Sequence, residues 1–244
     1  MAEKYFDLSP YNYVANNPLK FIDPDGKRID DFFFNFEGNL ISRVKNNLPD
    51  RFFIQMNLST KKFEPFISNI KGLNNQLTIP SIFKEIKLES QLGHMARTIY
   101  AEACGQSDIS KIAVGEVIRN RAMDITKSTS KNNYNARFSR VSTYKDVVTQ
   151  RGQIESVMNK VLRYSNPLKV TGGDLNTKKS RNNIETKSFQ KSIQAAIKAH
   201  NGSNLTNGAN YFFSPYISTP SWAKTMKLLE IKGINSNEFR FYKY

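Results

Sequence analysis

Cysteine, histidine and tryptophan are nearly absent from this 244-residue chain, which holds one cysteine, one tryptophan and two histidines. A single cysteine, Cys104, cannot form an intrachain disulfide or a cysteine-rich metal cluster. As a nucleophile it would need a histidine base, and only His94 and His200 are present, so we expect Cys104 to be a small apolar filler. With the two histidines far apart in sequence, the composition predicts no metal site and no cofactor.

Long apolar runs and a leader sequence are also missing. No apolar stretch is long enough to span a bilayer, so membrane insertion is not expected. The opening residues MAEKYFDLSPYNY lack the basic region followed by an apolar region that marks a secretory signal. A protein of this kind that acts outside the cytoplasm needs another export route. Hydrophobic residues at 39% and charged residues at 23% are typical of a globular protein with a real core.

Negative charge is scarce, and the imbalance lies in the second part of the chain. The net charge is +15, and residues 1–84 contribute only 11 Lys and Arg against 9 Asp and Glu. Residues 85–244 therefore form a strongly basic region. Such a surface favours a polyanion, which leaves nucleic acid, anionic lipid and an acidic cell-wall polymer as open alternatives.

The apolar pattern predicts three parts with different secondary structure. Residues 31–65 are rich in aromatic runs around Glu37-Gly38-Asn39, which favours strands joined by a hairpin turn. Helical spacing begins near Ile86, ends near Gly105, and resumes from Ser107 or Asp108 to about Met123. Another helix is predicted over 188–200, after a basic loop at 171–187, and the tail favours short strands. The pattern predicts an α+β fold that is mainly helical.

Two carboxylates stand out in these helices. Glu102 is the one charged residue of TIYAEACGQS, and Glu116 shares a helical stripe with Ile109, Ile112 and Ala113. Burying a carboxylate costs several kcal/mol unless it is paired or protonated. Two carboxylates facing a groove would suit glycoside cleavage, whereas a bond from Glu116 to a nearby arginine would be purely structural. The spacing alone leaves both open.

Residues 1–30 contain three short motifs: SPYNY at 9–13, NNPL at 16–19 and IDPDG at 22–26. With these motifs the segment resembles the closing segment of the Rhs/YD-repeat core found in polymorphic toxins. In that family the variable toxin begins just after the last motif, and many members cut themselves there, usually before a leucine. Here Lys27 follows Gly26. The resemblance implies that the remaining chain is a toxin tip, with residues 31–85 as a β-rich connecting module.

Residues 86–244 contain a series of sequence blocks: TIYAEACGQSDISKIAVGEVIRNRA from Thr98, VVTQRGQI from Val147 and NGANYFFSP from Asn207, followed by Trp222 and the closing aromatic residues. These blocks, in this order, resemble those of the SleB-type cell-wall hydrolases. Arg151 and Ile154 stand where the family more often has Pro and Phe. The resemblance implies a mainly helical domain similar to lysozymes and lytic transglycosylases, with a small β element. It also implies a peptidoglycan glycosidase, acting as a lytic transglycosylase or muramidase.

The same resemblance assigns roles to individual residues. Glu102 would be the catalytic general acid, protonating the bridging oxygen between N-acetylmuramic acid and N-acetylglucosamine. Its helix-end position beside apolar neighbours would favour the protonated form. We expect substrate contacts from a further set of residues: Glu116, Gln153, Asn210, Tyr211, Phe213 and Trp222. This chemistry requires no metal and no cofactor.

These observations predict an antibacterial toxin domain that is made in the cytoplasm, secreted, and active in the periplasm of a target cell. Its expected partners are peptidoglycan glycan strands, a secretion apparatus and a cognate immunity protein, with no nucleic acid. One alternative is a nuclease or nucleic-acid-binding Rhs tip, which the positive charge would suit. A catalytically silent wall-binding module is another.

Overall fold

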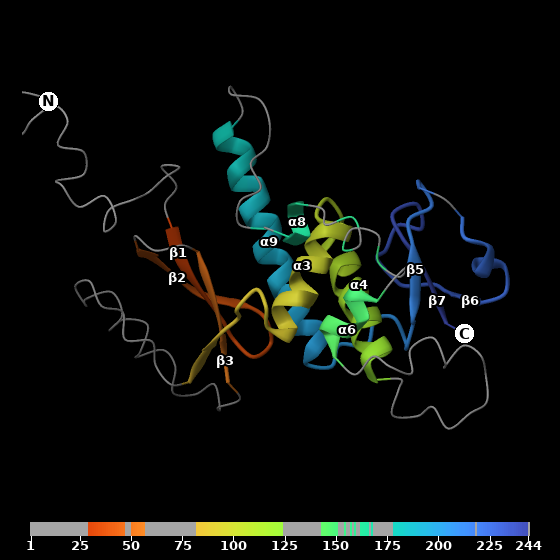
Figure 1. Ribbon diagram of the computed structural model, residues 1–244, viewed down its shortest axis with the longest axis horizontal. Coiled ribbons are helices and arrows are strands. Elements are labelled where there is room, and N and C mark those ends of the chain that lie inside the picture. The colour runs from red at the N-terminus through yellow and green to blue at the C-terminus, as the bar shows by residue number, and fades with distance from the viewer. Residues whose placement is uncertain are drawn as a thin grey trace, which may run out of the picture.

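The structure is a computed structural model, and Figure 1 shows its arrangement. It describes the following residues: 29–46, 50–56, 82–123, 143–150, 154, 157, 159, 162–165, 167, 178–217 and 219–243. Residues 1–28 of the Rhs-like segment and the predicted substrate residue Gln153 lie outside them. None of the helices in these ranges is both long and apolar enough to cross a bilayer.

The first part of the described chain is a four-stranded sheet. β1 (Ile29–Phe34) and β2 (Leu40–Asn46) form an antiparallel hairpin, and Gly38 at its tip has a φ of +80°, a conformation that glycine adopts readily. β3 (Arg51–Gln55) pairs in parallel with β1, and β4 (Phe83–Glu85) completes the order β2-β1-β3-β4. The predicted β-rich character of this region and its hairpin turn are confirmed.

This sheet is fixed to the helices by alternating phenylalanines. Phe32 and Phe52 stack at 5.3 Å on one face and belong to the same core as the helices. Phe52 also meets Phe189 of α9 (Lys178–His200) edge-on at 5.4 Å. The hairpin tip reaches the end of the same helix, since Asn201 Nδ2 donates to the Phe36 carbonyl. The sheet therefore shares a core with the helices that follow it.

Helices form the middle of the molecule. α3 (Gln91–Ala103) and α4 (Asp108–Met123) follow one another, and two short helices, α6 (Tyr144–Thr149) and α8 (Leu162–Ser165), pack beside α3. The long α9 crosses both α3 and α4, between them and the first sheet (Figure 1). Gly115 permits this crossing, because a Cβ there would lie 2.8 Å from Ala199 of α9.

Two helix boundaries differ from the prediction. α3 begins at Gln91 rather than near Ile86, because Ile86 N donates to Phe52 O across the first sheet and Ser90 caps the helix through Gly93 N. α9 begins at Lys178, so the loop predicted over 171–187 is wrong for its second half. That half carries no apolar periodicity, which is why the sequence did not mark it as helical.

A second, three-stranded sheet closes the fold. β5 (Tyr211–Phe213) and β6 (Lys227–Leu229) both run antiparallel to β7 (Arg240–Lys243), which lies between them. The connection from β5 to β6 must therefore cross β7, and it contains the short 3-10 helix η6 (Ser221–Lys224). The predicted α+β class is confirmed: a helical centre carries a small β element and is preceded by a β-rich segment.

Candidate active site

Glu102 lies in the last turn of α3, where the helix leaves the core. Ile99, Tyr100 and Ala103 around it are at most 1% exposed, whereas Glu102 itself is half-buried. The helix ends at Cys104, and Gln106 N donates to Ala103 O at 3.1 Å to close the following turn. A carboxyl group is thus held at the edge of a rigid apolar helix, with part of its surface open to solvent.

The turn after Glu102, residues 104–106, accepts hydrogen bonds from side chains of two helices. From α9, Ser188 Oγ donates to the Cys104 carbonyl at 2.6 Å. From α4, Lys111 Nζ donates to the Gln106 carbonyl. These contacts leave residues 104–106 little freedom to move, so the backbone that carries Glu102 is fixed before any substrate binds.

Lys111 is an unusual residue to find in this position. Its side chain is 2% exposed, and burial lowers the pKa of its ammonium group, an effect that Asp108 opposes. A buried lysine needs partners for its donors, and the carbonyl of Gln106 is one. The sequence analysis missed this residue, because nothing in its spacing distinguishes Lys111 from a surface lysine.

The start of α4 is tied to the end of the chain. Ser107 Oγ accepts from Ser110 N at 3.1 Å, so Ser107 acts as the predicted helix cap. Ser110 Oγ donates to Glu238 Oε2 at 2.9 Å, which brings the segment just before β7 against the turn after Glu102. On the exposed side, Lys191 of α9 pairs with Asp108 at 3.0 Å. The contacts of Ser110 with Glu238 and of Lys191 with Asp108 were not predicted, since each partner is remote in sequence.

Glu116 does not face outward as the predicted substrate contact requires. It is fully buried in α4, and its two carboxylate oxygens accept from Leu205 N at 2.9 Å, Thr206 N at 2.8 Å and Thr206 Oγ1 at 2.8 Å. These donors satisfy the carboxylate without the arginine considered from sequence. The correction is that Glu116 anchors the loop leading into β5.

Two further residues of α4 that belong to the family motif also bind the segment leading into β5. Asn120 Nδ2 donates to the Ala209 carbonyl at 2.8 Å, and Arg121 Nε donates to the Asn210 carbonyl at 2.6 Å. Asn210 N in turn donates to Tyr242 O at 3.0 Å. Asn210 is 5% exposed, so its backbone links α4 to the second sheet, and a substrate contact from its side chain stays a prediction.

The three aromatic candidates form one cluster. Trp222 lies 5.0 Å from Tyr211, 5.7 Å from Phe213 and 5.5 Å from Tyr242 between ring centroids. Tyr211 and Phe213 are 3% and 8% exposed, so they support the cluster from below. Trp222 is half-buried and offers the solvent-facing surface. Of the three, Trp222 has the most exposed side chain, and a substrate contact from any of them stays a prediction.

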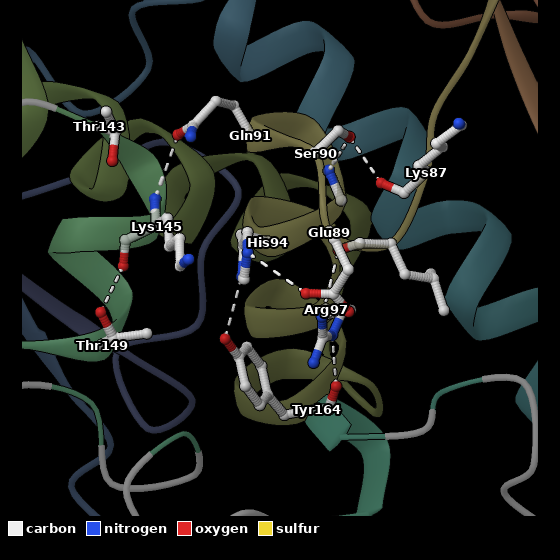
Figure 2. Close-up of polar contacts among 12 residues, drawn as sticks. Lys87, Glu89, Ser90, Gln91, His94, Arg97, Thr143, Lys145, Thr149 and Tyr164 are labelled. Carbon is white, nitrogen blue, oxygen red and sulfur yellow. Dashed lines mark hydrogen bonds and ion pairs between the residues drawn. The ribbon is translucent and has the colours of Figure 1, made fainter.

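Both histidines are engaged in contacts between helices. Figure 2 shows His94 between Tyr164, whose hydroxyl lies 3.1 Å from Nδ1, and Glu89, 3.7 Å from Nε2. Burial first, and Arg97 next, lower the pKa of His94. His200 Nδ1 lies 2.8 Å from the Tyr144 hydroxyl. Neither histidine is placed beside Glu102 by these contacts.

Metal ligands do not gather in the described part of the chain: no group of three or more His, Cys, Asp or Glu side chains there could hold an ion. The chemistry available at the end of α3 is that of a carboxyl group on a fixed turn. The described part of the chain therefore offers a half-buried carboxyl group on a fixed turn and, on the second sheet, a cluster of aromatic side chains.

The family assignment follows from comparison with known proteins. A family model described as Cell Wall Hydrolase matches residues 105–240, more than half of the chain. The chain belongs to this family of cell wall hydrolases. The match includes Glu116, Asn210, Tyr211, Phe213 and Trp222, and it begins just after Glu102. The resemblance to SleB-type hydrolases is thereby confirmed, while the role of Glu102 stays a prediction.

Two solved structures are also similar to this chain. One is the catalytic domain of the Bacillus cereus SleB protein, with 23% identity, a TM-score of 0.40, and coverage of 63% of this chain and 89% of that one. The other is the catalytic domain of the germination-specific lytic transglycosylase SleB from Bacillus anthracis, with 21% identity, a TM-score of 0.41, and coverage of 68% and 100%. No curated protein matches the chain.

Proposed function

We propose that this cell wall hydrolase cleaves peptidoglycan glycan strands between N-acetylmuramic acid and N-acetylglucosamine, with Glu102 as the general acid. The observation that carries the proposal is the position of Glu102. It is half-buried at the end of a helix whose neighbouring residues are buried, on a turn fastened by Ser188 and Lys111. A proton donor has to be held in place while the substrate bond breaks, and a clamped turn provides this.

The reaction begins when the Glu102 carboxyl group donates its proton to the bridging oxygen. The bond between this oxygen and C1 of the muramic residue then breaks, and positive charge develops on the sugar ring. A nucleophile attacks C1, and the Glu102 carboxylate accepts the proton that it loses. If the nucleophile is the C6 hydroxyl of the same sugar, the product is a 1,6-anhydro ring. If it is water, the product is a reducing end.

The position of Glu116 supports the first of these outcomes. A muramidase with two carboxylates needs the second one near the sugar, but Glu116 is fully buried and bonded to Leu205 and Thr206. Ring closure by the C6 hydroxyl needs one carboxylate, acting first as acid and then as base. We therefore propose lytic transglycosylase activity in preference to hydrolysis by water.

The biological setting belongs to the same proposal. Residues 1–30 resemble the end of an Rhs core, which supports delivery of the enzyme as an antibacterial toxin to the periplasm of a target cell. A secretion apparatus of the producing cell would carry it, and a cognate immunity protein would protect that cell. The high positive charge of the enzyme, +15, suits an acidic cell wall. Expression in the periplasm with and without a candidate immunity protein tests this setting.

The chemical test compares the protein with its Glu102→Gln variant on purified peptidoglycan. Mass spectrometry of the released fragments distinguishes 1,6-anhydro ends from reducing ends. Glu230→Gln is the matched control, because Glu230 is exposed on the segment after β6. We expect anhydro products from the protein and from the control. Nicking of DNA or RNA in place of wall cleavage would support the nuclease alternative and refute the proposal.

A further inference from the structure

The segment that crosses the second sheet presents side chains outside the site described above. This segment joins β5 to β6, which lie on opposite sides of β7, and its described residues are 214–217 and 219–226. Trp222 fixes this segment by packing on the face formed by Tyr211, Phe213 and Tyr242. Trp222 therefore holds the segment between β5 and β6 against an aromatic surface.

Just before Trp222, two large hydrophobic side chains are exposed to solvent. Tyr216 is 77% exposed and Ile217 is 78% exposed, more than any other large hydrophobic residue in the described part of the chain. They are presented by a tight turn in which Ile217 N donates to Ser214 O at 3.1 Å. Neighbouring exposed aromatic and aliphatic side chains on a fixed turn mark a surface for interaction.

A chain of contacts connects this turn to the turn after Glu102. The turn after Glu102 leads into α4, where Ser110 bonds to Glu238. Two residues later Arg240 begins β7 and pairs with Phe213, the last residue of β5. The segment carrying Tyr216 starts at the next residue. A long polymer that reaches Glu102 can therefore extend toward this turn.

The charge around the crossing segment fits an acidic polymer. Lys224, in the same short helix as Trp222, is exposed, and so is Lys227 at the start of β6. Peptidoglycan offers both features that such a surface recognises: sugar rings for aromatic side chains and carboxylates on its stem peptides for lysines. A nucleic acid would find cations here as well, but sugar rings stack on a tyrosine without unpairing of bases.

We propose that Tyr216 and Ile217, together with the exposed part of Trp222, form an accessory binding site for a peptidoglycan glycan strand. The site holds sugars outside the bond that is cleaved, with Lys224 and Lys227 contacting stem-peptide carboxylates. The inference rests on the proposed function, because it takes the same polymer as the substrate of Glu102. Its consequence is that long strands bind better than short fragments.

The test compares Tyr216→Ala, Tyr216→Phe and the control Met123→Ala. Met123 is 60% exposed at the far end of α4, so its variant removes an exposed apolar side chain away from the crossing segment. The measurements are co-sedimentation with insoluble peptidoglycan and steady-state cleavage of long strands and of short purified fragments. We expect Tyr216→Ala to weaken sedimentation and raise KM on long strands roughly fivefold, with kcat and short-fragment cleavage unchanged. Tyr216→Phe and Met123→Ala should match the original protein.

The outcomes separate this inference from the proposed function. If the original protein neither binds nor cleaves peptidoglycan, the proposed function fails. If it cleaves and Tyr216→Ala sediments and turns over long strands as before, the accessory site is refuted. Equal losses on long strands and short fragments also refute it, because an accessory site acts only on strands long enough to reach it. If the protein binds nucleic acid and this binding depends on Tyr216, the ligand of the surface is a nucleic acid and not a glycan, and the inference is overturned.

Discussion

Replacing Glu116 by Gln is expected to destabilise the fold while leaving catalysis by the folded protein intact. The Glu116 carboxylate accepts three hydrogen bonds from Leu205 and Thr206, at 2.8 to 2.9 Å, in a fully buried site. An amide has one oxygen in place of two, so at best it keeps both bonds to Thr206 and turns its NH2 group toward Leu205 N. The hydrogen bond from Leu205 N to a charged carboxylate is then lost. The amide NH2 group also faces the Leu205 N–H group, so two donors lie opposite each other.

The cost of this change follows from the bonds that are lost. A hydrogen bond to a charged group contributes about 1.5–3 kcal/mol, so Glu116→Gln should lower the free energy of unfolding by roughly 2 kcal/mol. For a chain of this size that corresponds to a fall in Tm of about 4–8 °C. Glu116→Ala removes the acceptor for all three donors and should cost about 4 kcal/mol or more.

The assay is denaturant unfolding together with peptidoglycan cleavage at a temperature where the variants stay folded. The exposed Glu230→Gln serves as the control and should change stability by less than about 0.5 kcal/mol. A Glu116→Gln protein with unchanged stability would refute the anchoring role. Unchanged stability with a raised KM would restore the substrate contact expected from the sequence.

Two other predictions concern ionisable groups whose pKa departs from its ordinary value. Lys111→Met should leave the free energy of unfolding within about 1 kcal/mol, because a buried charge is exchanged for an apolar chain of similar size. It should lower kcat, because the turn after Glu102 loses its bond to Gln106; an unchanged kcat contradicts this. Burial lowers the pKa of both histidines, with Arg97 adding to the effect at His94 and Arg119 at His200. Their contribution to stability is therefore complete above about pH 6.5 and is lost as the pH falls through the lowered values. The double variant H94Q/H200Q should show a flatter decline of the unfolding midpoint between pH 7 and pH 5, and an equal decline would contradict it.

Local patterns predicted much of the fold. The phenylalanines of β1 and β3, the hairpin at Gly38 and the Ser107 cap of α4 all depend on neighbouring residues. The predictions that failed concern helix starts that depend on contacts between residues remote in sequence. Ile86 looks helical by spacing but pairs with Phe52 of the first sheet, and the start of α9 has no apolar stripe to mark it.

In the candidate site, too, neighbouring residues predict some positions, whereas others depend on contacts remote in sequence. The helical spacing predicted that Glu102 lies at a helix end, and it does. Glu116 was expected to face substrate, because spacing shows a carboxylate on an apolar stripe but not the backbone donors of Leu205 and Thr206 that receive it. Lys111 was not singled out, because its burial depends on how α4 packs.

Cleavage of purified peptidoglycan by the Glu102→Gln variant tests the central claim most directly. The amide keeps the shape of the side chain but has no acidic proton to give to the glycosidic oxygen, so the rate should fall about 10²–10⁴-fold with stability unchanged. Mass spectrometry of the products from the original protein should show 1,6-anhydro ends. Wall cleavage by the variant at the original rate would contradict the account.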